Sequence, residues 1–466
     1  GKCPKYVKID KNLQIYLNNG FDYLLKDSFV KNSYSTSKQL TNKRFILALE
    51  HSKSQMDKVM TKLSRGQYLN KIPGMRTLTN KDTLTQSFQR QEEFLKNTSI
   101  QPTAPIYAKT WLPHQFDDLR AVFNKSQFYV AKPFKSYAGK GIVVSNSPAK
   151  LLQPGHIVQT YETDMLLYKG HKFDIRMYLL VTSIDPLIAY LHYPGFLRVA
   201  RQKYQPPTPE NAENAFVHLT NLHQSGVGNN KVFKTEDGFN GVVNLDQFLE
   251  EVETHKQYFN FLDSQTNITA QNLRESLLAT VETLLVTTYP EILQEAQASK
   301  SDLHLHPKQT FQIIGVDCYF DVRGNARVFE ANRGPDLHGT PQTKHTAKRR
   351  AVVDALNLLG VRWHQWKGKV VEPLLGVNHV AVPRNKAQEK QSMSFEGLLM
   401  AGSELSMANL TKIEKNAFKQ IAEEETRLGG YVRLRFENYL NMFRNTSYLT
   451  QMVYQKIKND QNKIYK

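Results

Sequence analysis

Residues 311–332, with the sequence FQIIGVDCYFDVRGNARVFEAN, alternate apolar and polar side chains on both sides of a Val-Arg-Gly-Asn segment. This pattern predicts two antiparallel strands joined by a tight turn. A two-residue turn at Arg323-Gly324 would place Asp317 opposite Glu330, and a turn one residue later would place it opposite Asn332. Because side chains repeat every second residue, Glu330 and Asn332 share a face in either register. The hairpin therefore predicts that two carboxylates and an amide meet on one sheet surface.

Two carboxylates on neighbouring strands repel each other. At about 4 Å and an effective dielectric constant near 20, the repulsion is on the order of 4 kcal/mol. A divalent cation would remove it, and two carboxylates with an amide suit Mg²⁺, which keeps waters and binds nucleotide phosphates. Alternatively, Asp317 and Glu330 pair with lysine or arginine at a sheet edge. The hairpin alone leaves both interpretations open.

The composition is that of a folded protein. The 466 residues are 40% apolar and 11% aromatic, enough for two to four domains with a sizeable core. No stretch reaches the roughly 18–20 apolar residues of a membrane span, and the first ten residues, GKCPKYVKID, lack the apolar core of a signal peptide. Cys3 and Cys318 are far apart and support neither a disulfide framework nor a zinc site. We expect a soluble protein of a reducing compartment.

The chain is strongly basic, with a formal net charge of +18. The first 65 residues hold 13 Lys and Arg against five Asp and Glu, and the segment KHTAKRR at 344–350 adds a further cluster. Such a charge attracts polyanions, whether nucleic acid, anionic lipid or an acidic protein tail. Alternatively, it is an ordinary solvated surface. Charge alone does not choose among these partners.

The order of the patterns indicates an α+β protein. Helical periodicity is expected at 44–63, strands and turns alternate from 106 onward, and a proline-rich loop follows at 201–216. A helical block is expected over about 243–298, ahead of the hairpin. Beyond a linker-like segment at 383–394, residues 408–428 have helical periodicity and charge. The sequence thus predicts antiparallel sheet around a site, with a helical C-terminal extension.

The segment AKPFKSYAGKGIVV at 131–144 carries a glycine-containing loop between two expected strands. Backbone N–H groups and the ammonium groups of Lys132, Lys135 and Lys140 could wrap phosphates there. The segment is not a P-loop, because GxxxxGK[ST] is absent and a strand follows it. A Gly-Lys-Gly hairpin turn without function remains the alternative.

Three charged residues alternate along KFDIRMYLLV at 172–181. As a strand, it presents Lys172, Asp174 and Arg176 on one face and apolar side chains on the other. The row is either a surface ladder or the wall of a site with cations ready for phosphate or carboxylate.

The segment HLTN at 218–221 supplies Thr220 and Asn221 as neutral hydrogen-bonding groups. His218 is expected to be a hydrogen-bonded core histidine more readily than a catalyst. Arg198 could bind an anion or form a surface ion pair.

These segments, in this order, resemble the tubulin tyrosine ligase-like family, a branch of the ATP-grasp ligases. The resemblance covers roughly residues 70 to 450. It is carried by KIPGMRTLTNKDTLTQSFQR, PIYAKTWLP, KPFKSYAGKGI, QTYETDMLLYKGHKFDIRMYLLV, HLTN, GVDCYFD with VFEAN, and EEETRLGGYVRLRF.

The resemblance implies an ATP-grasp fold with N-terminal, central and C-terminal subdomains. We expect these at 1–105, 106–168 and 169–375, and a linker with a helical extension at 376–466. It also implies ATP and Mg²⁺ as cofactors. Nucleotide contacts are expected from Lys132, Ser136, Gly139, Lys140, Gly141, Gln159, Tyr161, Lys172, Asp174, Thr220 and Asn221. Magnesium ligands are expected at Asp317, Glu330 and Asn332, and oxyanion stabilisation at Arg176 and Arg198.

The implied activity is an ATP-dependent amino-acid ligase that modifies the acidic C-terminal tails of tubulin through an acyl-phosphate. Glutamate addition is the first expectation, with glycylation or tyrosination by the same machinery as the alternative. A non-catalytic microtubule-binding protein that keeps the fold is a further alternative, which retention of the three metal ligands disfavours. Nucleic-acid binding is disfavoured because no binding motif with interleaved aromatics is present.

The chain also departs from the family pattern. Thr160 stands where the family often has lysine. The metal motif continues as NRGPDLHG, which includes Arg333 and Asp336, whereas the family usually has Pro-Ser or Pro-Ala after it. These two residues leave the added amino acid open. We expect a monomer in the cytoplasm, associated with the cytoskeleton and with a cilium or basal body as a candidate place.

Overall fold

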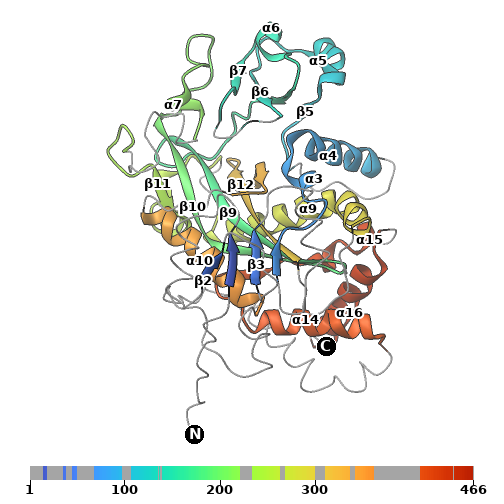
Figure 1. Cartoon of the computed structure of the whole chain (residues 1–466). Helices are drawn as coiled ribbons and strands as arrows, with labels where there is room; N and C mark the ends of the chain where they lie inside the picture. The colour runs from blue at the N-terminus through green and yellow to red at the C-terminus, as the bar shows by residue number, and fades with distance from the viewer. Residues whose placement is uncertain are drawn as a thin grey trace.

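Two β-sheets, one large and one small, organise the described part of the chain (Figure 1). The computed structural model describes residues 14–17, 35–37, 45–49, 68–96, 106–134, 136, 139–220, 234–262, 268–299, 310–335, 342–360, 410–443 and 446–464. The expected α+β architecture, with antiparallel sheets and flanking helices, is confirmed. None of the helices in these ranges is both long and apolar enough to span a membrane.

Four long strands form the centre of the large sheet. They are β9 (His171–Ile184), β10 (Leu187–Lys203), β12 (Thr310–Phe320) and β13 (Ala326–Asn332). All their pairings are antiparallel, in the spatial order β10-β9-β12-β13. Short antiparallel strands β11 (Val242–Asn244) and β14 (Tyr431–Arg433) both pair with β10.

The N-terminal strands extend this sheet in parallel. They are β1 (Gln14–Leu17), β2 (Ser35–Ser37), β3 (Phe45–Leu49) and β4 (Tyr68–Asn70), and β4 joins β12. The helix expected from residue 44 is therefore wrong for its first part. A five-residue apolar run, FILAL, suits a strand as well as a helix turn, and here pairing with β1 and β4 decides. Residues 50–63 lie outside the described residues.

The hairpin of β12 and β13 places Asp317 opposite Glu330, but the connection between the strands is not the expected two-residue turn. Phe320 pairs with Ala326, so the connection is longer, and Asp321 accepts hydrogen bonds from the backbone N–H groups that follow it, with Gly324 in the left-handed region. A bulge at Phe329 then shifts the register by one residue.

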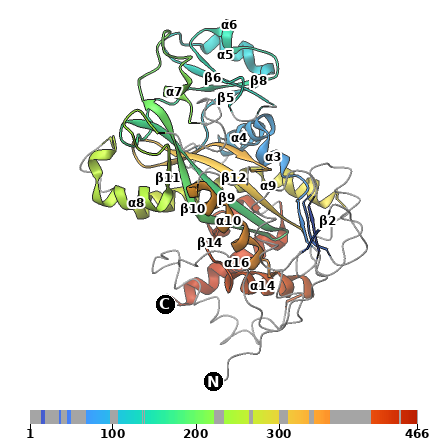
Figure 2. The ribbon, with the colours of Figure 1, turned by 60° about the vertical axis from the view of Figure 1, so that its left-hand side comes forward.

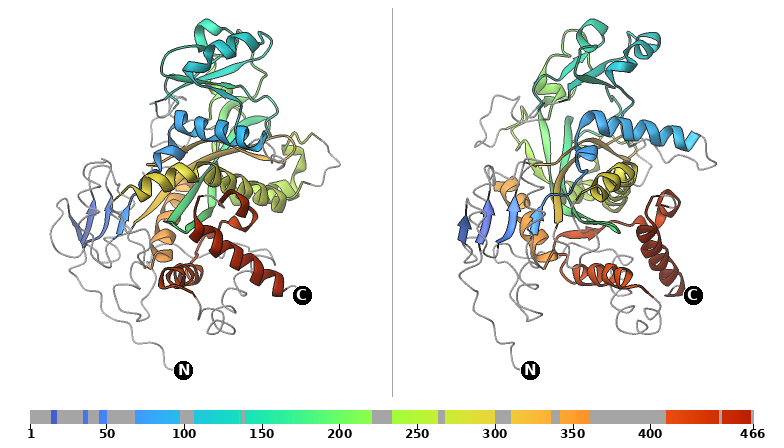
Figure 3. Two further views of the ribbon diagram at one scale, coloured as in Figure 1. Left: turned by 90° about the vertical axis from the view of Figure 1, so that its right-hand side faces the viewer. Right: turned by 45° about the vertical axis from the view of Figure 1, so that its right-hand side comes forward.

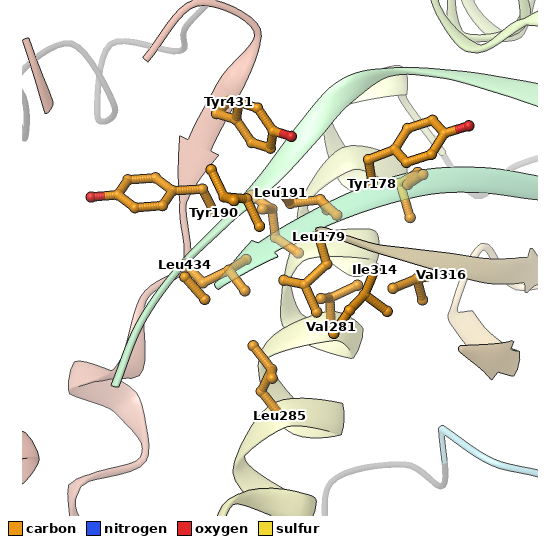
Figure 4. Packing of buried hydrophobic residues seen from close by; sticks show 14 of the residues in the cluster. Tyr178, Leu179, Tyr190, Leu191, Val281, Leu285, Ile314, Val316, Tyr431 and Leu434 are labelled. Carbon is orange, nitrogen blue, oxygen red and sulfur yellow. The ribbon is translucent and has the colours of Figure 1, made fainter. Parts of the chain in front are cut away.

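Helix α9 (Ala270–Gln297) covers the apolar face of the central strands. Thr269 caps its N-terminus, and its hydroxyl accepts from the Asn272 N–H. Figure 4 shows Val281 and Leu285 of the helix packing below Leu179, Ile314 and Val316. Because side chains alternate along a strand, this packing leaves the charged residues of β9 and β12 on the opposite face.

The small sheet lies over that opposite face, beyond one end of β9 and β10 (Figure 2). Its strands, in spatial order, are β5 (Thr110–Trp111), β8 (His156–Thr160), β6 (Tyr129–Pro133) and β7 (Val143–Ser145). Helices α5 (Phe116–Val122) and α6 (Pro148–Leu151) pack with it. Other helices at the large sheet are α3 (Arg76–Thr79), α4 (Lys81–Lys96), α7 (Ala215–His218), α8 (Leu245–Thr254) and α10 (Gln342–Leu358).

The C-terminal residues pack against the end of the large sheet that lies away from the small sheet (Figure 3). Helices α14 (Lys412–Glu425), α15 (Leu440–Phe443) and α16 (Tyr448–Ile464) surround strand β14. The buried hydroxyl of Tyr454 donates to the Leu187 carbonyl oxygen at 2.7 Å. The expected helix over 408–428 is confirmed as α14, and the C-terminal segment also contributes a strand to the core.

Candidate functional site

The charged row of β9 lies inside the protein. Lys172, Asp174 and Arg176 are 5%, 4% and 8% exposed, so the row is not a surface ladder. A buried charge is costly unless it is paired or meets a ligand. The contacts of these three side chains therefore define what the site can bind.

Asp317 on β12 is ion-paired with two arginines. Its carboxylate accepts hydrogen bonds from Nε and Nη2 of Arg176, the second at 2.8 Å, and Nη2 of Arg198 lies 2.9 Å from its Oδ2. Burial alone would raise the pKa of Asp317, but the charges and hydrogen bonds of Arg176 and Arg198 outweigh it and hold the pKa at about 2. The alternative interpretation of the hairpin, pairing with arginine, therefore holds for Asp317 in this structure.

Arg198 on β10 bridges two carboxylates. Its Nε and Nη2 donate to Asp174 at 2.6 and 2.9 Å while Nη2 also reaches Asp317. The hydroxyl of Thr220 donates to the second oxygen of Asp174. Asp174, Arg198 and Thr220 thus lie in one cluster, whereas Asn221 lies outside the described residues.

Glu330 and Asn332 extend this cluster on β13. Nδ2 of Asn332 donates to Asp317 at 3.3 Å and to Glu330 at 3.5 Å, and Lys81 at the start of α4 lies 3.5 Å from Glu330. No group of three Asp, Glu, His or Cys side chains in the described ranges could hold a metal ion by itself. The three oxygen-bearing side chains nevertheless converge, and rotation of the amide would turn its oxygen toward the carboxylates. This donor set fits a hard cation such as Mg²⁺.

Gly315 on β12, which has no side chain, leaves room for the guanidinium group of Arg176. A Cβ at Gly315 would lie 2.9 Å from the Cβ of Pro335 and 3.3 Å from the Cδ and Nε of Arg176. Any larger residue would push the guanidinium away from Asp317. Gly315 therefore fixes where this charge sits, a role that the alternating pattern of the hairpin did not indicate.

The glycine-containing loop joins β6 to β7 as predicted. Gly139 and Gly141 have φ values of 73° and 74°, a left-handed conformation that favours glycine. Lys132 precedes the loop, and its ammonium group lies 5.6 Å from the ring centroid of Phe329. Loss of solvent lowers the pKa of Lys132 to about 8, although Glu330 raises it in part. Ser136 and the exposed Lys140 lie in or beside this loop, and Lys135 lies outside the described residues.

A chain of hydrogen bonds connects Lys172 with Tyr161, His218 and Asn211. The ammonium group of Lys172 donates to the Tyr161 hydroxyl at 2.9 Å, and that hydroxyl lies 2.8 Å from Nδ1 of His218. Burial, with Lys172 nearby, lowers the pKa of His218 to about 4, so the ring is neutral. Its Nε2 faces Oδ1 of Asn211 at 3.2 Å. His218 is thus the hydrogen-bonded core histidine that was expected.

Gln159, expected at the base of the nucleotide, lies on β8 and is 3% exposed. Its amide donates to the Thr110 hydroxyl at 2.8 Å. Burial lowers the pKa of Lys172 to about 7, with Lys132 adding to the effect. Among the expected nucleotide residues, Lys132 and Gln159 thus lie on the small sheet, and Lys172 and Asp174 lie on the large one.

Sequence reasoning missed two neighbours of the metal residues, Lys81 and Phe329. Lys81 belongs to a segment that carries the family resemblance, and its contact with Glu330 spans 249 residues of chain. Phe329 faces Lys132 because of the bulge, which the alternating pattern does not reveal. Arg333, one residue past β13, is exposed.

Comparison with known proteins points to one family. The model described as "Tubulin-tyrosine ligase family" matches residues 58–365. Relatives include tubulin polyglutamylase TTLL13 of Mus musculus, 27% identical over 85% of this chain and 46% of the relative. Tubulin polyglutamylase TTLL7 of Homo sapiens is 26% identical over 66% of this chain and 34% of the relative. A probable beta-tubulin polyglutamylase of Tetrahymena thermophila is 26% identical over 79% of this chain and 29% of the relative. The chain thus spans less than half the length of these relatives.

Proposed function

Because the chain belongs to the Tubulin-tyrosine ligase family, we propose that it is an ATP-dependent ligase that adds glutamate to the acidic C-terminal tails of tubulin. One observation carries the proposal: Asp317, Glu330 and Asn332 converge beside buried or shielded cations on β6, β9 and β10. Glutamate is the proposed donor because the relatives are named as polyglutamylases.

The nucleotide would lie between the two sheets. Lys132 and the loop from Ser136 to Gly141 would hold its phosphates, since Gly139 and Gly141 are left-handed and backbone N–H groups in such turn conformations can bind anions. Lys172 faces the same region with a pKa near 7, low enough that an arriving anion would favour its charged form. Gln159 and Tyr161 would contact the base side.

Asp317, Glu330 and Asn332 would hold the magnesium ion. A bound Mg²⁺ supplies charge neutralisation on phosphate oxygens. Both carboxylate oxygens of Asp317 accept hydrogen bonds from Arg176 in this structure, so binding of the cation would compete with that pairing and loosen it. Arg176 and Arg198 would then be free to turn toward a substrate oxygen.

The reaction would proceed in two steps. The γ-phosphoryl group of ATP is transferred to an acceptor carboxylate, giving an acyl-phosphate and ADP. The amine of the incoming amino acid then attacks the acyl carbon, releases phosphate and loses a proton. Arg176 and Arg198 would stabilise the oxyanion of that step by charge. No enzyme nucleophile is required, in agreement with Cys318, whose thiol pKa is raised by burial.

The net charge supports an acidic acceptor. A formal charge of +18 favours association with the glutamate-rich ends of a partner, and microtubules would be the place of action.

Mass spectrometry of tubulin tests the proposal. Microtubules are incubated with the protein, ATP, and glutamate, glycine or tyrosine in separate reactions, with Glu330→Gln as the matched inactive control. A ladder of glutamate increments that requires ATP is the expected result. Glycine or tyrosine increments would replace the donor, and binding to microtubules without any mass change would favour a non-catalytic protein.

A further inference from the structure

The proline-rich loop between β10 and α7, residues 204–214, takes no part in the roles above. It leaves the large sheet at the end of β10 and reaches the small sheet, where its buried residue Ala212 packs in one cluster with Val144 of β7 and with Tyr161. Asn211 directly precedes Ala212 in the chain. Asn211 is therefore held at the place where the loop meets the small sheet.

Two backbone groups fix the orientation of the Asn211 side-chain amide. Its Nδ2 donates to the Pro206 carbonyl oxygen at 2.9 Å, and its Oδ1 accepts from the Thr208 N–H at 2.8 Å. A backbone carbonyl can only accept and a backbone N–H can only donate. The opposite amide orientation would set acceptor against acceptor at Pro206 and donor against donor at Thr208. The atom of Asn211 that lies 3.2 Å from Nε2 of His218 is therefore an oxygen, which can only accept.

This acceptor selects one tautomer of His218. Nε2 must carry the proton in order to donate to Asn211, and the neutral ring then has no proton on Nδ1. Nδ1 lies 2.8 Å from the hydroxyl of Tyr161, so that hydroxyl must donate to it. The oxygen of the hydroxyl keeps a lone pair for the ammonium group of Lys172, which donates at 2.9 Å. Every hydrogen bond from Asn211 to Lys172 thus has a fixed direction, which the backbone partners of Asn211 determine.

The other tautomer of His218 would reverse this chain. Its Nδ1–H would donate to the Tyr161 oxygen, and the hydroxyl proton would turn toward Lys172. A hydroxyl that accepts from an amine favours the charged ammonium form, whereas one that donates favours the uncharged amine. We propose that Asn211 is a positioning residue for nucleotide binding, which acts through His218 and Tyr161 to hold Lys172 in place as a cation. This inference rests on the proposed ATP-dependent function and adds to it a residue that lies outside the predicted nucleotide contacts.

Nitrogen NMR of the full chain with isotope-labelled histidine tests the first step without nucleotide. The signals of His218 are those that disappear in His218→Gln. The wild type should show the Nε2–H tautomer, and Asn211→Leu, which removes the acceptor, should show the Nδ1–H tautomer or a mixture. Glu213→Gln is the matched control, because it removes only an exposed ion pair of the same loop with Lys150 and should leave the tautomer unchanged. An Nδ1–H tautomer in the wild type, or an unchanged Nε2–H tautomer in Asn211→Leu, would overturn the proposal.

Titration with ATP by calorimetry tests the link to Lys172. Asn211→Leu should weaken ATP binding about three- to tenfold, the effect of roughly one hydrogen bond, and Glu213→Gln should not weaken it. This loss should be absent when Asn211→Leu is combined with Lys172→Met, because the chain then ends at a side chain that cannot be charged. Should Lys172→Met bind ATP too weakly for titration, Lys172→Arg takes its place, since arginine stays charged whichever way the Tyr161 hydroxyl points.

The outcomes separate this inference from the function on which it rests. Equal ATP binding by the wild type and Asn211→Leu would overturn the positioning role and leave the ligase proposal standing. The same loss of affinity with and without the substitution of Lys172 would also overturn it, because Asn211 would then only support the loop. A wild-type protein that does not bind ATP would overturn both proposals.

Discussion

Glu424 on α14 carries a buried carboxyl group that holds the C-terminal helix to the sheet. Its Oε2 accepts hydrogen bonds from Tyr190 at 2.8 Å and Thr182 at 2.9 Å, and its Oε1 accepts from Nε2 of Gln420 at 2.8 Å. Burial outweighs these donors and raises its pKa from an ordinary value of 4.5 to about 7. We predict that Glu424→Gln stabilises the protein above pH 7.

The sign follows from the raised pKa. The folded state favours the protonated form, so the contribution of Glu424 to stability is complete below about pH 4.5 and is lost as the pH rises through about 7. The difference between 4.5 and about 7, at about 1.4 kcal/mol per pKa unit, corresponds to a loss of about 3 kcal/mol by pH 8. A glutamine never ionises and escapes this loss.

The structure can accommodate the amide. Its oxygen would take the place of Oε2 and accept from Tyr190 and Thr182 as before. Its nitrogen would face Gln420, whose own Oε1 has no partner among the described residues and could accept after rotation of that amide. Few new unpaired groups are therefore created, and most of the gain should be seen.

Urea unfolding followed by circular dichroism at pH 5.5 and pH 8 is the assay. The free energy of unfolding of Glu424→Gln should exceed that of the wild type by about 2–3 kcal/mol at pH 8 and by much less at pH 5.5. Glu250→Gln, on an exposed position of α8, is the control and should show no such pH dependence. Equal differences at the two pH values would refute the reasoning, because the ionised carboxylate would then not be the destabilising species.

Three further predictions concern the site. Glu330→Gln keeps the shape of the side chain but removes a metal charge partner, so ligation should be abolished with little change in melting temperature; unchanged turnover would contradict the metal assignment. Microtubule co-sedimentation should weaken from low to physiological salt, because exposed charges are screened within about 8–10 Å, and also after proteolytic removal of the tubulin tails. Arg333→Ala should raise the Michaelis constant for glutamate several-fold and leave the affinity for ATP unchanged, because the side-chain carboxylate of the donor glutamate would be buried without a cation, which is costly. An unchanged Michaelis constant would mean that another residue binds that carboxylate.

Much of the site was predictable because it depends on short-range rules. Side chains alternate along strands, so the faces of Lys172, Asp174 and Arg176, and of Glu330 and Asn332, follow from spacing once a strand is assigned. The pairing of Asp317 with Glu330 was one of two predicted registers. In the structure this pairing results from a longer turn followed by a bulge. Backbone N–H groups of the turn donate hydrogen bonds to Asp321, and the alternating pattern does not predict these bonds.

What was missed depends on contacts between distant segments. Pairing of β3 with β1 and β4 overrides a pattern at residue 44 that fits a helix equally well. The place of Lys81 beside Glu330 requires α4 and β13 to be neighbours in space. Pairing of the carboxylate of Asp317 with both Arg176 and Arg198 likewise requires three strands to be aligned. A single sequence contains the residues that form these contacts, but no local pattern in it indicates which of them are neighbours in space.

The balance of charge in the site argues for an anionic ligand. Five basic side chains face four acidic ones: Lys81, Lys132, Lys172, Arg176 and Arg198 against Glu162, Asp174, Asp317 and Glu330. The arginines are satisfied by Asp174 and Asp317, so the surplus falls on the lysines. Burial lowers the pKa of Lys132 to about 8 and that of Lys172 to about 7, so the free site can shed part of this surplus near neutral pH. A triphosphate carries more negative charge than one magnesium ion neutralises, and its arrival would favour the charged forms again. Nucleotide binding and metal binding at this site would therefore favour each other, because the metal would neutralise charge on the carboxylates and the phosphates would neutralise charge on the lysines.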